Sequence, residues 1–220
     1  MPNHITNIIK SSQCVIDALK GEKELVDFNT IIPMPQPLRG ITSNGDDDLV
    51  KLLNGELSIN PPHDDLIANM QLSNVLRGFQ NGGMKEWDNK RFENFIAMLQ
   101  NYREYGFVSW YDFGCGKWGT KWNAYEIEIV DGGVKFETAW SAPHPVIKAL
   151  AARFPDVCIE HLWADENIGS NLGHRRYCNV EFDLPIADPI DFALTLNESS
   201  REYYRKNPAT GTWEYDDSKE

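Results

Sequence analysis

Four side chains in the second half of this sequence have types that suit acid–base or hydrolytic chemistry: Glu126, Glu128, His161 and Asp165. Paired carboxylates can pass protons to and from a substrate. Glu126 and Glu128 fall on one face of an expected strand, about 7 Å apart from the strand rise, and that face of an alternating strand typically meets solvent. A hydrolase or nuclease would need all four side chains to meet in one pocket. The sequence shows no such constellation, so we expect no catalytic residues and a protein that is not an enzyme.

Metal and cofactor sites are not expected either. Zinc needs three or four converging Cys, His or carboxylate ligands, whereas Glu160 and His161 point to opposite faces of their expected strand. Cys115 has no histidine near it in the sequence, so it is not expected to be a nucleophile. The cysteines lie far apart and form no Cys-x-x-Cys pair: Cys14, Cys115, Cys158 and Cys178. We therefore expect reduced thiols in a cytoplasm, with Cys158 in the core.

The stretch GCGKWGTK, residues 114–121, satisfies the G-x-G-x-x-G pattern of nucleotide-binding loops. Such a loop binds phosphate because a helix begins at its last glycine. Here the residues that follow read TKWNAYEIEIV and predict a strand, and Lys121 does not follow a glycine as it would in a Walker loop. We therefore expect no nucleotide site. The glycines instead let the backbone pass close to Trp110, Trp118 and Trp122, which we expect to anchor the connection into a hairpin.

The same stretch also offers a candidate binding site. Aromatic rings beside lysines can stack on nucleic-acid bases or become buried in the surface of a protein partner. The candidate residues are Trp118, Lys121, Trp122 and Tyr125. The sequence leaves open whether they form an exposed patch of this kind or a structural anchor.

Charge restricts the class of partner. The net charge is −12, and the excess of acids lies mainly in residues 111–220, which carry −8 against −4 for residues 1–110. Duplex DNA binding needs clustered Lys and Arg and is therefore not expected. A protein partner and a single-stranded nucleic acid both stay open. No apolar run approaches the ~18 residues needed to span a membrane, and the start of the sequence has no secretory signal.

Apolar periodicity predicts the order of the elements. Strands are expected at residues 3–10, 25–33, 124–130, 134–140, 157–166 and 175–184. Helices are expected at residues 12–20, 88–105, 143–155 and 189–206. Together they predict an α+β fold, with a mostly antiparallel sheet and helices packed on one face.

The domain organisation follows from the same pattern. Residues 3–33 would form a β-α-β unit, and residues 34–85 a helical insertion, because prolines, glycines and an acidic run interrupt the regular pattern there. We expect one domain over residues 1–206, followed by a polar acidic tail at residues 207–220.

Three segments carry a resemblance to a known family. They are MPNHITN (residues 1–7), WGTKWNAYE (118–126) and TAWSAPHPVIKALAARFP (138–155) followed by WADENIG. In these segments the chain resembles the YubB-like family of phage and conjugative-plasmid proteins of unknown function, although GCGK before the tryptophan block is richer in glycine than in that family. The resemblance implies a ferredoxin-like C-terminal part, a mobile-element setting and a cytoplasmic location in the host. It implies no reaction.

The leading hypothesis is therefore a non-enzymatic accessory protein of a phage or plasmid that binds a host or phage protein, for example as a counter-defence inhibitor. The first alternative is a single-stranded nucleic-acid-binding protein that uses an aromatic sheet face. The second alternative is a hydrolase or nuclease built on the four acid–base candidates.

Overall fold

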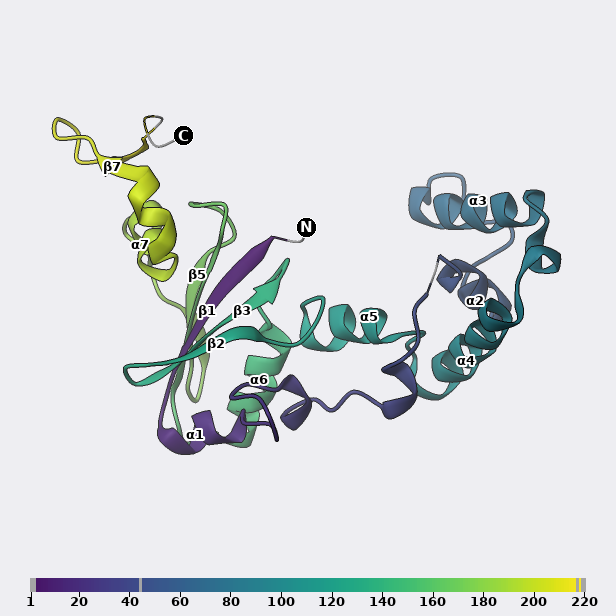
Figure 1. The fold of residues 1–220 in the computed structure, drawn as a ribbon, viewed down its shortest axis with the longest axis horizontal. Helices are drawn as coiled ribbons and strands as arrows, with labels where there is room; N and C mark the ends of the chain where they lie inside the picture. The colour runs from purple at the N-terminus through teal and green to yellow at the C-terminus, as the bar shows by residue number, and fades with distance from the viewer. Residues whose placement is uncertain (1–2, 44, 217, 219–220) are drawn as a thin grey trace. The chain divides into compact units, whose positions relative to one another are not determined.

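The computed structural model describes residues 3–43, 45–216 and 218. Met1 and Pro2 of the first resembling segment, and residues 217, 219 and 220 of the expected tail, lie outside the described residues. The chain divides into two compact units (Figure 1). One, the sheet unit, comprises Met1–Pro33 and Gly114–Glu220, and the other, the helical unit, comprises Met34–Phe113.

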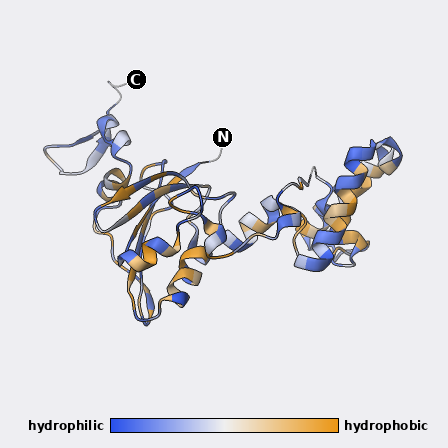
Figure 2. Ribbon diagram, turned by 60° about the horizontal axis from the view of Figure 1, so that its bottom comes forward, coloured by the Kyte–Doolittle hydropathy of each residue, from blue (hydrophilic) through white to orange (hydrophobic). Residues whose placement is uncertain are grey.

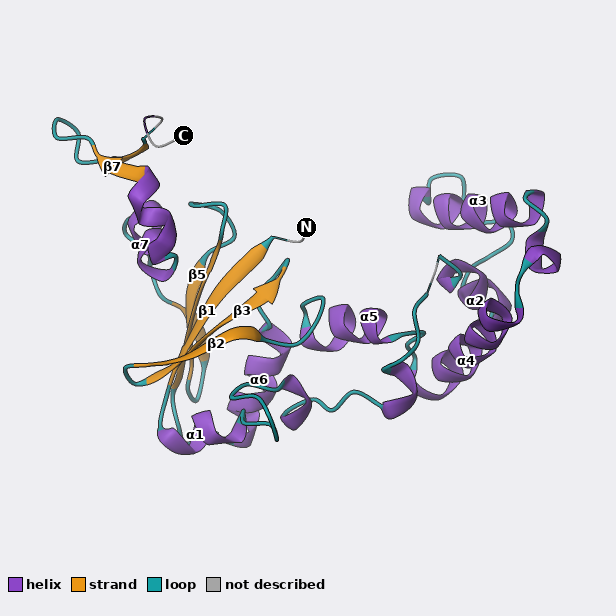
Figure 3. Ribbon diagram, viewed as in Figure 1, coloured by secondary structure: helices purple, strands orange, loops and turns teal. Residues whose placement is uncertain are grey.

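The sheet unit is built on a six-stranded antiparallel sheet in the order β2-β3-β1-β4-β5-β6. Figure 3 shows β1, β2, β3 and β5 of this sheet. The strands are β1 (His4–Lys10), β2 (Tyr125–Val130), β3 (Gly133–Ala139), β4 (Ile159–Asp165), β5 (Gly173–Tyr177) and β6 (Glu181–Asp183). The helices α1 (Gln13–Ala18) and α6 (His144–Arg153) complete a β-α-β-β-α-β pattern with the first four strands. This is the ferredoxin-like arrangement, so the expected α+β fold class is confirmed.

One face of the sheet carries the main core. Ile5 and Ile9 of β1 are fully buried, as alternation along a strand with one covered face requires. Asn7 lies between them on the same face, and its burial is compensated because its amide donates to Ile5 O and Thr138 Oγ1. Ile5 also packs against Ala142 and Trp163. The ring of His144, at the start of α6, contacts the ring of Trp163, which places α6 on this face.

A third helix covers part of the opposite face. The helix α7 (Pro189–Leu196) begins after Asp188, whose carboxylate accepts hydrogen bonds from two backbone N–H groups of the first turn. Its residues Ala193 and Leu196 pack against Ala164 of β4. Helices therefore lie on both faces of the sheet, and the expectation of a single helical layer holds only for the ferredoxin-like part.

Two of the expected elements differ in the structure. Residues 25–33 do not form a strand but include the 3-10 helix η1 (Phe28–Thr30), because the Asp27 side chain accepts from Asn29 N and turns the chain. The β-α-β unit expected at residues 3–33 is therefore wrong. Residues 175–184 fall in two strands, β5 and β6, which pair with each other as a hairpin.

The end of the chain also differs from expectation. The helix expected at residues 189–206 stops at Leu196 and is followed by the 3-10 helix η5 (Glu198–Tyr203) and by β7 (Tyr204–Lys206). The strand β8 (Trp213–Tyr215), within the expected tail, pairs with β7. The indole Nε1–H of Trp213 donates to Asp191 of α7 at 3.0 Å, so this hairpin is attached to the sheet unit.

The cysteines correct another expectation. Cys158 and Cys178 form a disulfide bond, with their Cα atoms 4.4 Å apart. The strand register explains the pairing, since Ile159 lies opposite Tyr177 and the two cysteines follow at the next position outward. Cys158 is therefore neither a reduced thiol nor a core residue, because it is exposed. Cys14 and Cys115 are exposed as well.

The helical unit comprises η2 (Gln36–Leu38), α2 (Asp47–Leu53), α3 (Leu66–Gln80), η3 (Gly83–Glu86), α4 (Asn89–Tyr105) and α5 (Trp110–Phe113). Its core contains Val50, Phe95, Met98 and Val108. Because α4 shares this core with α2, the unit extends to residue 113, beyond the insertion expected at residues 34–85. Among the described residues, no helix combines the length and the hydropathy that a membrane span requires.

Candidate binding site at the end of the sheet

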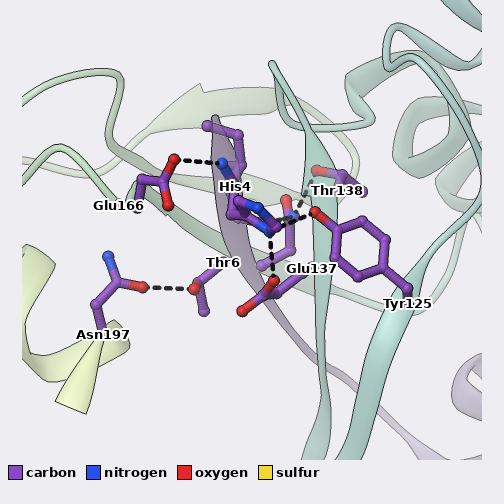
Figure 4. A network of polar contacts seen from close by, with 9 residues as sticks. His4, Thr6, Tyr125, Glu137, Thr138, Glu166 and Asn197 are labelled. Carbon is purple, nitrogen blue, oxygen red and sulfur yellow. Dashed lines mark hydrogen bonds and ion pairs between the residues drawn. The ribbon is translucent and has the colours of Figure 1, made fainter. Parts of the chain in front are cut away.

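Polar and aromatic side chains gather where the central strand β1 begins. His4 of β1, Tyr125 of β2 and Glu137 of β3 meet there, on the face opposite the main core (Figure 4). The register brings them together: Glu137 lies opposite both Thr6 and Tyr125. His4 and Thr6 are two residues apart, so they share this face. We call His4, Tyr125, Glu137 and the neighbouring Glu166 the sheet-end cluster.

The imidazole of His4 is the centre of the sheet-end cluster. Its Nδ1 lies 2.9 Å from the Tyr125 hydroxyl and 3.0 Å from Glu137 Oε2. Nδ1 can accept from the phenol when it is unprotonated, or donate to the carboxylate when it carries a proton. The backbone N–H of His4 donates to Glu166 Oε1 at 3.2 Å (Figure 4). Two carboxylates therefore flank one half-exposed histidine.

The electrostatic potential at the Tyr125 hydroxyl is negative. Burial, and then the nearby carboxylates of Glu137, Glu166 and Glu126, together raise the pKa of the Tyr125 hydroxyl to about 12. Each carboxylate opposes formation of a phenolate, as like charges do. The hydroxyl therefore keeps its proton at neutral pH and acts as a hydrogen-bond donor.

A row of aromatic rings continues from Tyr125. The Trp122 ring meets the Tyr125 ring edge-on, with centroids 6.3 Å apart. The Lys121 ammonium lies 4.7 Å from the Trp122 ring centroid and 4.6 Å from that of Trp140. Both distances are within the range of cation–π attraction. Trp140 is 42% exposed, so this end of the sheet presents aromatic surface to solvent.

Trp140 is held in an unusual backbone conformation. Its φ is +74°, in the left-handed region that costs energy for a residue with a bulky side chain. Its N–H donates to Asn3 O at 2.8 Å, which ties it to the start of β1. Asn3 is in turn fixed by a hydrogen bond from its side chain to Asp165 Oδ1 at 3.3 Å. Such strain persists where the surroundings over-determine it, and it concentrates at functional sites.

The structure separates the four sequence candidates for binding. Lys121, Trp122 and Tyr125 lie beside one another, as described above. Trp118 does not join them, because its side chain is buried, its Nε1–H donates to Ile32 O at 2.9 Å, and its ring packs edge-on against Phe28. The expectation that Trp118 contributes to a binding surface is therefore wrong, whereas its role as an anchor is the one that its contacts support.

The glycines around Trp118 have a packing role. Gly114 begins the π-helical turn η4 (Gly114–Trp118). Gly119 has a φ of +77°, and a Cβ atom there would lie 2.7 Å from Cδ of Pro145. The next element after Gly119 is the strand β2 and not a helix, so the helix N-terminus that a nucleotide loop requires does not follow this glycine.

The four acid–base candidates do not meet. Glu126 and Glu128 are exposed on β2, and Glu128 forms an ion pair with Lys135 at 3.2 Å. His161 is fully buried on the main core face. Asp165 accepts a hydrogen bond from Asn167 N, besides the one from Asn3. Among residues 3–43, 45–216 and 218, no group of three or more His, Cys, Asp or Glu side chains has the arrangement of a metal site.

Sequence reasoning missed His4, Glu137, Trp140 and Glu166. His4 and Glu137 are separated by 133 positions, and only strand pairing brings them together. The available local signal was alternation, since Lys135 and Glu137 both stand on the outer face of β3. That signal identifies a polar face and does not identify which residue of another strand lies opposite.

Comparison with known proteins relates part of the chain to a family. Residues 117–204 match the family model described as the ferredoxin-like domain in Api92-like protein. No curated protein matches the chain. The crystal structure of a protein api92 from Yersinia pseudotuberculosis covers 85% of this chain and 99% of its own, at 11% identity and a TM-score of 0.39. The family match supports a related family for residues 117–204, and it does not identify the YubB-like family itself. Residues 117–204 are thus similar to the ferredoxin-like domain of the Api92-like proteins.

Proposed function

We propose that the protein is a non-enzymatic protein-binding module, and that the aromatic and acidic end of its sheet recognises a basic segment of a partner. The observation that carries this proposal is the environment of Tyr125. Its ring lies beside His4 and Trp122, and the charges of three carboxylates act on its hydroxyl. Aromatic faces beside carboxylates suit the guanidinium of Arg or the ammonium of Lys, through cation–π attraction and charge-assisted hydrogen bonds.

The molecule already contains one example of this recognition. Lys121 holds its ammonium between the rings of Trp122 and Trp140, at 4.7 and 4.6 Å from their centroids. A second cation, supplied by a partner, would find the free carboxylate oxygens of Glu137 and Glu166 close by. The net charge of −12 favours encounter with a basic protein surface in the same way.

The resemblance to YubB-like proteins supports the biological setting of the proposal. It favours an accessory protein of a phage or plasmid that acts in the cytoplasm of the host. The partner would then be a host or phage protein, such as a defence factor that is inhibited on binding. Thiols in a cytoplasm are normally kept reduced, so formation of the Cys158–Cys178 bond in this location would require an oxidant.

Single-stranded nucleic acid is the alternative partner. The exposed ring of Trp140 and the ammonium of Lys121 favour it, because bases stack on aromatic rings and phosphates attract ammonium groups. Glu126, Glu137 and Glu166 oppose it, because a phosphate approaching Tyr125 would meet three carboxylates. The balance of charge at the site therefore favours a basic protein segment.

Affinity capture with matched variants tests the proposal. The wild-type protein, Trp122→Ala, Glu137→Gln and the control Glu22→Gln would each be tagged and incubated with host lysate, with and without nuclease. Glu22 is exposed in the sheet unit and makes the same charge change outside the sheet-end cluster. We expect a defined partner that survives nuclease and is retained by Glu22→Gln but lost from Trp122→Ala and Glu137→Gln.

Two outcomes would reject this function. One is a set of captured proteins that is the same for all four proteins, since the sheet end would then play no part. The other is capture that disappears with nuclease, together with binding of a labelled oligothymidine that Trp122→Ala weakens. That result would assign the aromatic surface to single-stranded nucleic acid.

A further inference from the structure

The helical unit contains a cavity of about 250 Å³ between α2, α3, η3 and the start of α4. Its apolar walls are formed by Leu49, Val75, Phe79, Met84 and Trp87. All of the residues that line it belong to the helical unit, and in Figure 2 hydrophobic segments run along the helices of this unit. The cavity is distinct from the sheet-end cluster, which belongs to the sheet unit.

An ion pair fixes one wall of the cavity. Arg91 donates to both carboxylate oxygens of Asp46, at 2.7 and 3.1 Å, and its guanidinium lies 4.5 Å from the Trp87 ring centroid. Asp46 is only 5% exposed, so this forked pair is held in place. The Trp87 ring also packs edge-on against Phe95 of the core. This wall is therefore preformed in the unbound protein.

The opposite wall leaves apolar surface unprotected. Phe79 is 52% exposed and Met84 is 37% exposed, although both line the cavity. Leu76, one turn before Phe79 on α3, is 51% exposed. Large apolar side chains around a preformed hollow are the arrangement into which a partner inserts an anchoring side chain.

Size and charge decide what the occupant is. Pockets for drug-sized ligands are about 300–1,000 Å³, so 250 Å³ is too small for most of them and suits one large side chain. The charges that line the cavity are Asp46, Glu86 and Arg91. Since Asp46 and Arg91 neutralise each other, Glu86 remains as the charge at the rim. The helical unit as a whole has an excess of acidic over basic residues.

We propose that this cavity binds a single large apolar side chain from a helical segment of a partner protein, and that a Lys or Arg next to that side chain pairs with Glu86. Helices that dock into grooves present their anchors in this way, with apolar residues on one face and charges beside them. The cavity is then a second contact surface, and it does not depend on the role of the sheet-end cluster.

The variant that tests the cavity is Gly78→Leu. Gly78 lines the cavity, and a Cβ atom built on it would meet no heavy atom within 4 Å. A leucine there adds apolar bulk at the wall of the cavity, where its Cβ atom has open space, and it replaces a helix-weakening glycine by a good helix former. The matched control is Gln80→Leu, which adds the same exposed side chain on α3 at a position that does not line the cavity.

The readout is the methyl resonances of methionine in the full-length protein labelled with [13C-methyl]methionine. Met84 lines the cavity, whereas Met70, 67% exposed on α3, lies outside it and reports non-specific apolar contact. The probe is a synthetic amphipathic helical peptide with one phenylalanine at the centre of its apolar face and lysines beside it. Two matched peptides carry alanine for the phenylalanine or glutamates for the lysines.

We expect the lysine peptide to shift the Met84 resonance and to leave Met70 unchanged. The alanine peptide, the glutamate peptide and the Gly78→Leu protein should each weaken binding by about tenfold or more, whereas Gln80→Leu should not. Equal shifts of Met70 and Met84, an unaffected Gly78→Leu protein, or equal binding of the lysine and glutamate peptides would overturn the proposal. So would a Met84 resonance that moves with protein concentration alone, because the occupant would then be a second copy of the chain.

Discussion

The fully buried imidazole of His161 lies edge-on to that of His144, with ring centroids 5.5 Å apart, and the Nδ1 atoms of both are buried without a hydrogen-bond partner in the described structure. His161 Nε2 lies 3.0 Å from Asn7 Oδ1. This pair sits between β4 and the first residue of α6. Because a second proton on either ring would find no acceptor at Nδ1, the packing here favours neutral histidines.

Acid should therefore weaken the fold. Burial, and then the charges of His144, Arg175 and His174, lower the pKa of His161 well below 6.5, and burial lowers that of His144. Asp183 and Glu181 oppose the shift at His144. Because the pKa of these histidines is lower in the folded state, the unfolded chain binds more protons. Their contribution to the free energy of unfolding is therefore fully present above about pH 6.5 and is lost as the pH falls below it.

Urea unfolding at about pH 7.5 and about pH 5.5 measures this effect. His161→Gln keeps a donor for Asn7 and removes the titrating group, so its loss of stability on acidification should be smaller than that of the wild type. His63→Gln, which changes an exposed histidine of the helical unit, is the control. The same pH dependence in His161→Gln and in the wild type would show that other groups carry the effect.

Trp118→Ala should lower the free energy of unfolding by about 3–5 kcal/mol, the usual cost of removing a large buried aromatic ring. The substitution removes the contact of the Trp118 ring with Phe28 and the hydrogen bond from its Nε1–H to Ile32 O. Trp140→Ala, at an exposed site, should cost far less. Urea denaturation of both variants decides the point, and a cost for Trp118→Ala as small as that for Trp140→Ala would contradict a core position.

Gly119→Ala and Gly132→Ala separate backbone strain from close packing. Both glycines have positive φ, +77° and +70°, so both variants bear the strain of the left-handed region. A Cβ atom at Gly132 meets nothing within 4 Å, whereas at Gly119 it lies 2.7 Å from Pro145 Cδ. We expect about 1 kcal/mol for Gly132→Ala and about 2–3 kcal/mol for Gly119→Ala. Equal costs in thermal or urea unfolding would remove the role of Pro145.

Reduction of the Cys158–Cys178 bond should destabilise the sheet unit by about 3 kcal/mol, because the bond closes a loop of 20 residues. Cys158→Ser should reproduce this loss, and Cys14→Ser, at an exposed thiol, should not. Thiol titration of the unfolded, unreduced protein is the direct check. It should detect two of the four cysteines, and detection of all four would show that the bond does not form.

Glu137→Gln should lower the pKa of Tyr125 from about 12 towards its ordinary value, since a carboxylate that opposes the phenolate is removed. Ultraviolet absorbance titration follows the phenolate, and the difference between each protein and its Tyr125→Phe counterpart isolates this residue. The shift should be downward. An unchanged Tyr125 titration would mean that burial alone sets the pKa.

The sequence predicted those elements whose signal is local. The alternation in residues 124–140 and the periodicity in residues 88–105 and 143–155 correspond to β2, β3, α4 and α6. The strand expected at residues 25–33 failed because the Asp27 carboxylate captures Asn29 N and stabilises a 3-10 turn, although Val26 and Phe28 are buried as in a strand. Apolar alternation records burial, and it does not record which backbone conformation achieves it.

The candidate site depended on information of another kind. Lys121, Trp122 and Tyr125 are neighbours in the chain, so their grouping could be predicted. Trp118 belongs to the same block, but its side chain is buried in the core. The end of the π-helical turn η4 and Gly119, with its positive φ, separate it from the other three residues. His4 and Glu137 join through the register of β1 with β3, and no pattern within either segment specifies that register.

The helical unit separates β1 from both of its strand partners along the chain. β1 is synthesised first, yet its neighbours β3 and β4 begin only at Gly133 and Ile159. The helical unit, by contrast, is one continuous segment and completes its own core by residue 113. During synthesis from the N-terminus, this unit can therefore fold while the central strand still has nothing to pair with. Pairing of β1 with β3 and β4 joins strands that are far apart in the sequence. Folding of the helical unit brings the two ends of the intervening segment closer together, and the rate of sheet formation should reflect this shorter effective loop.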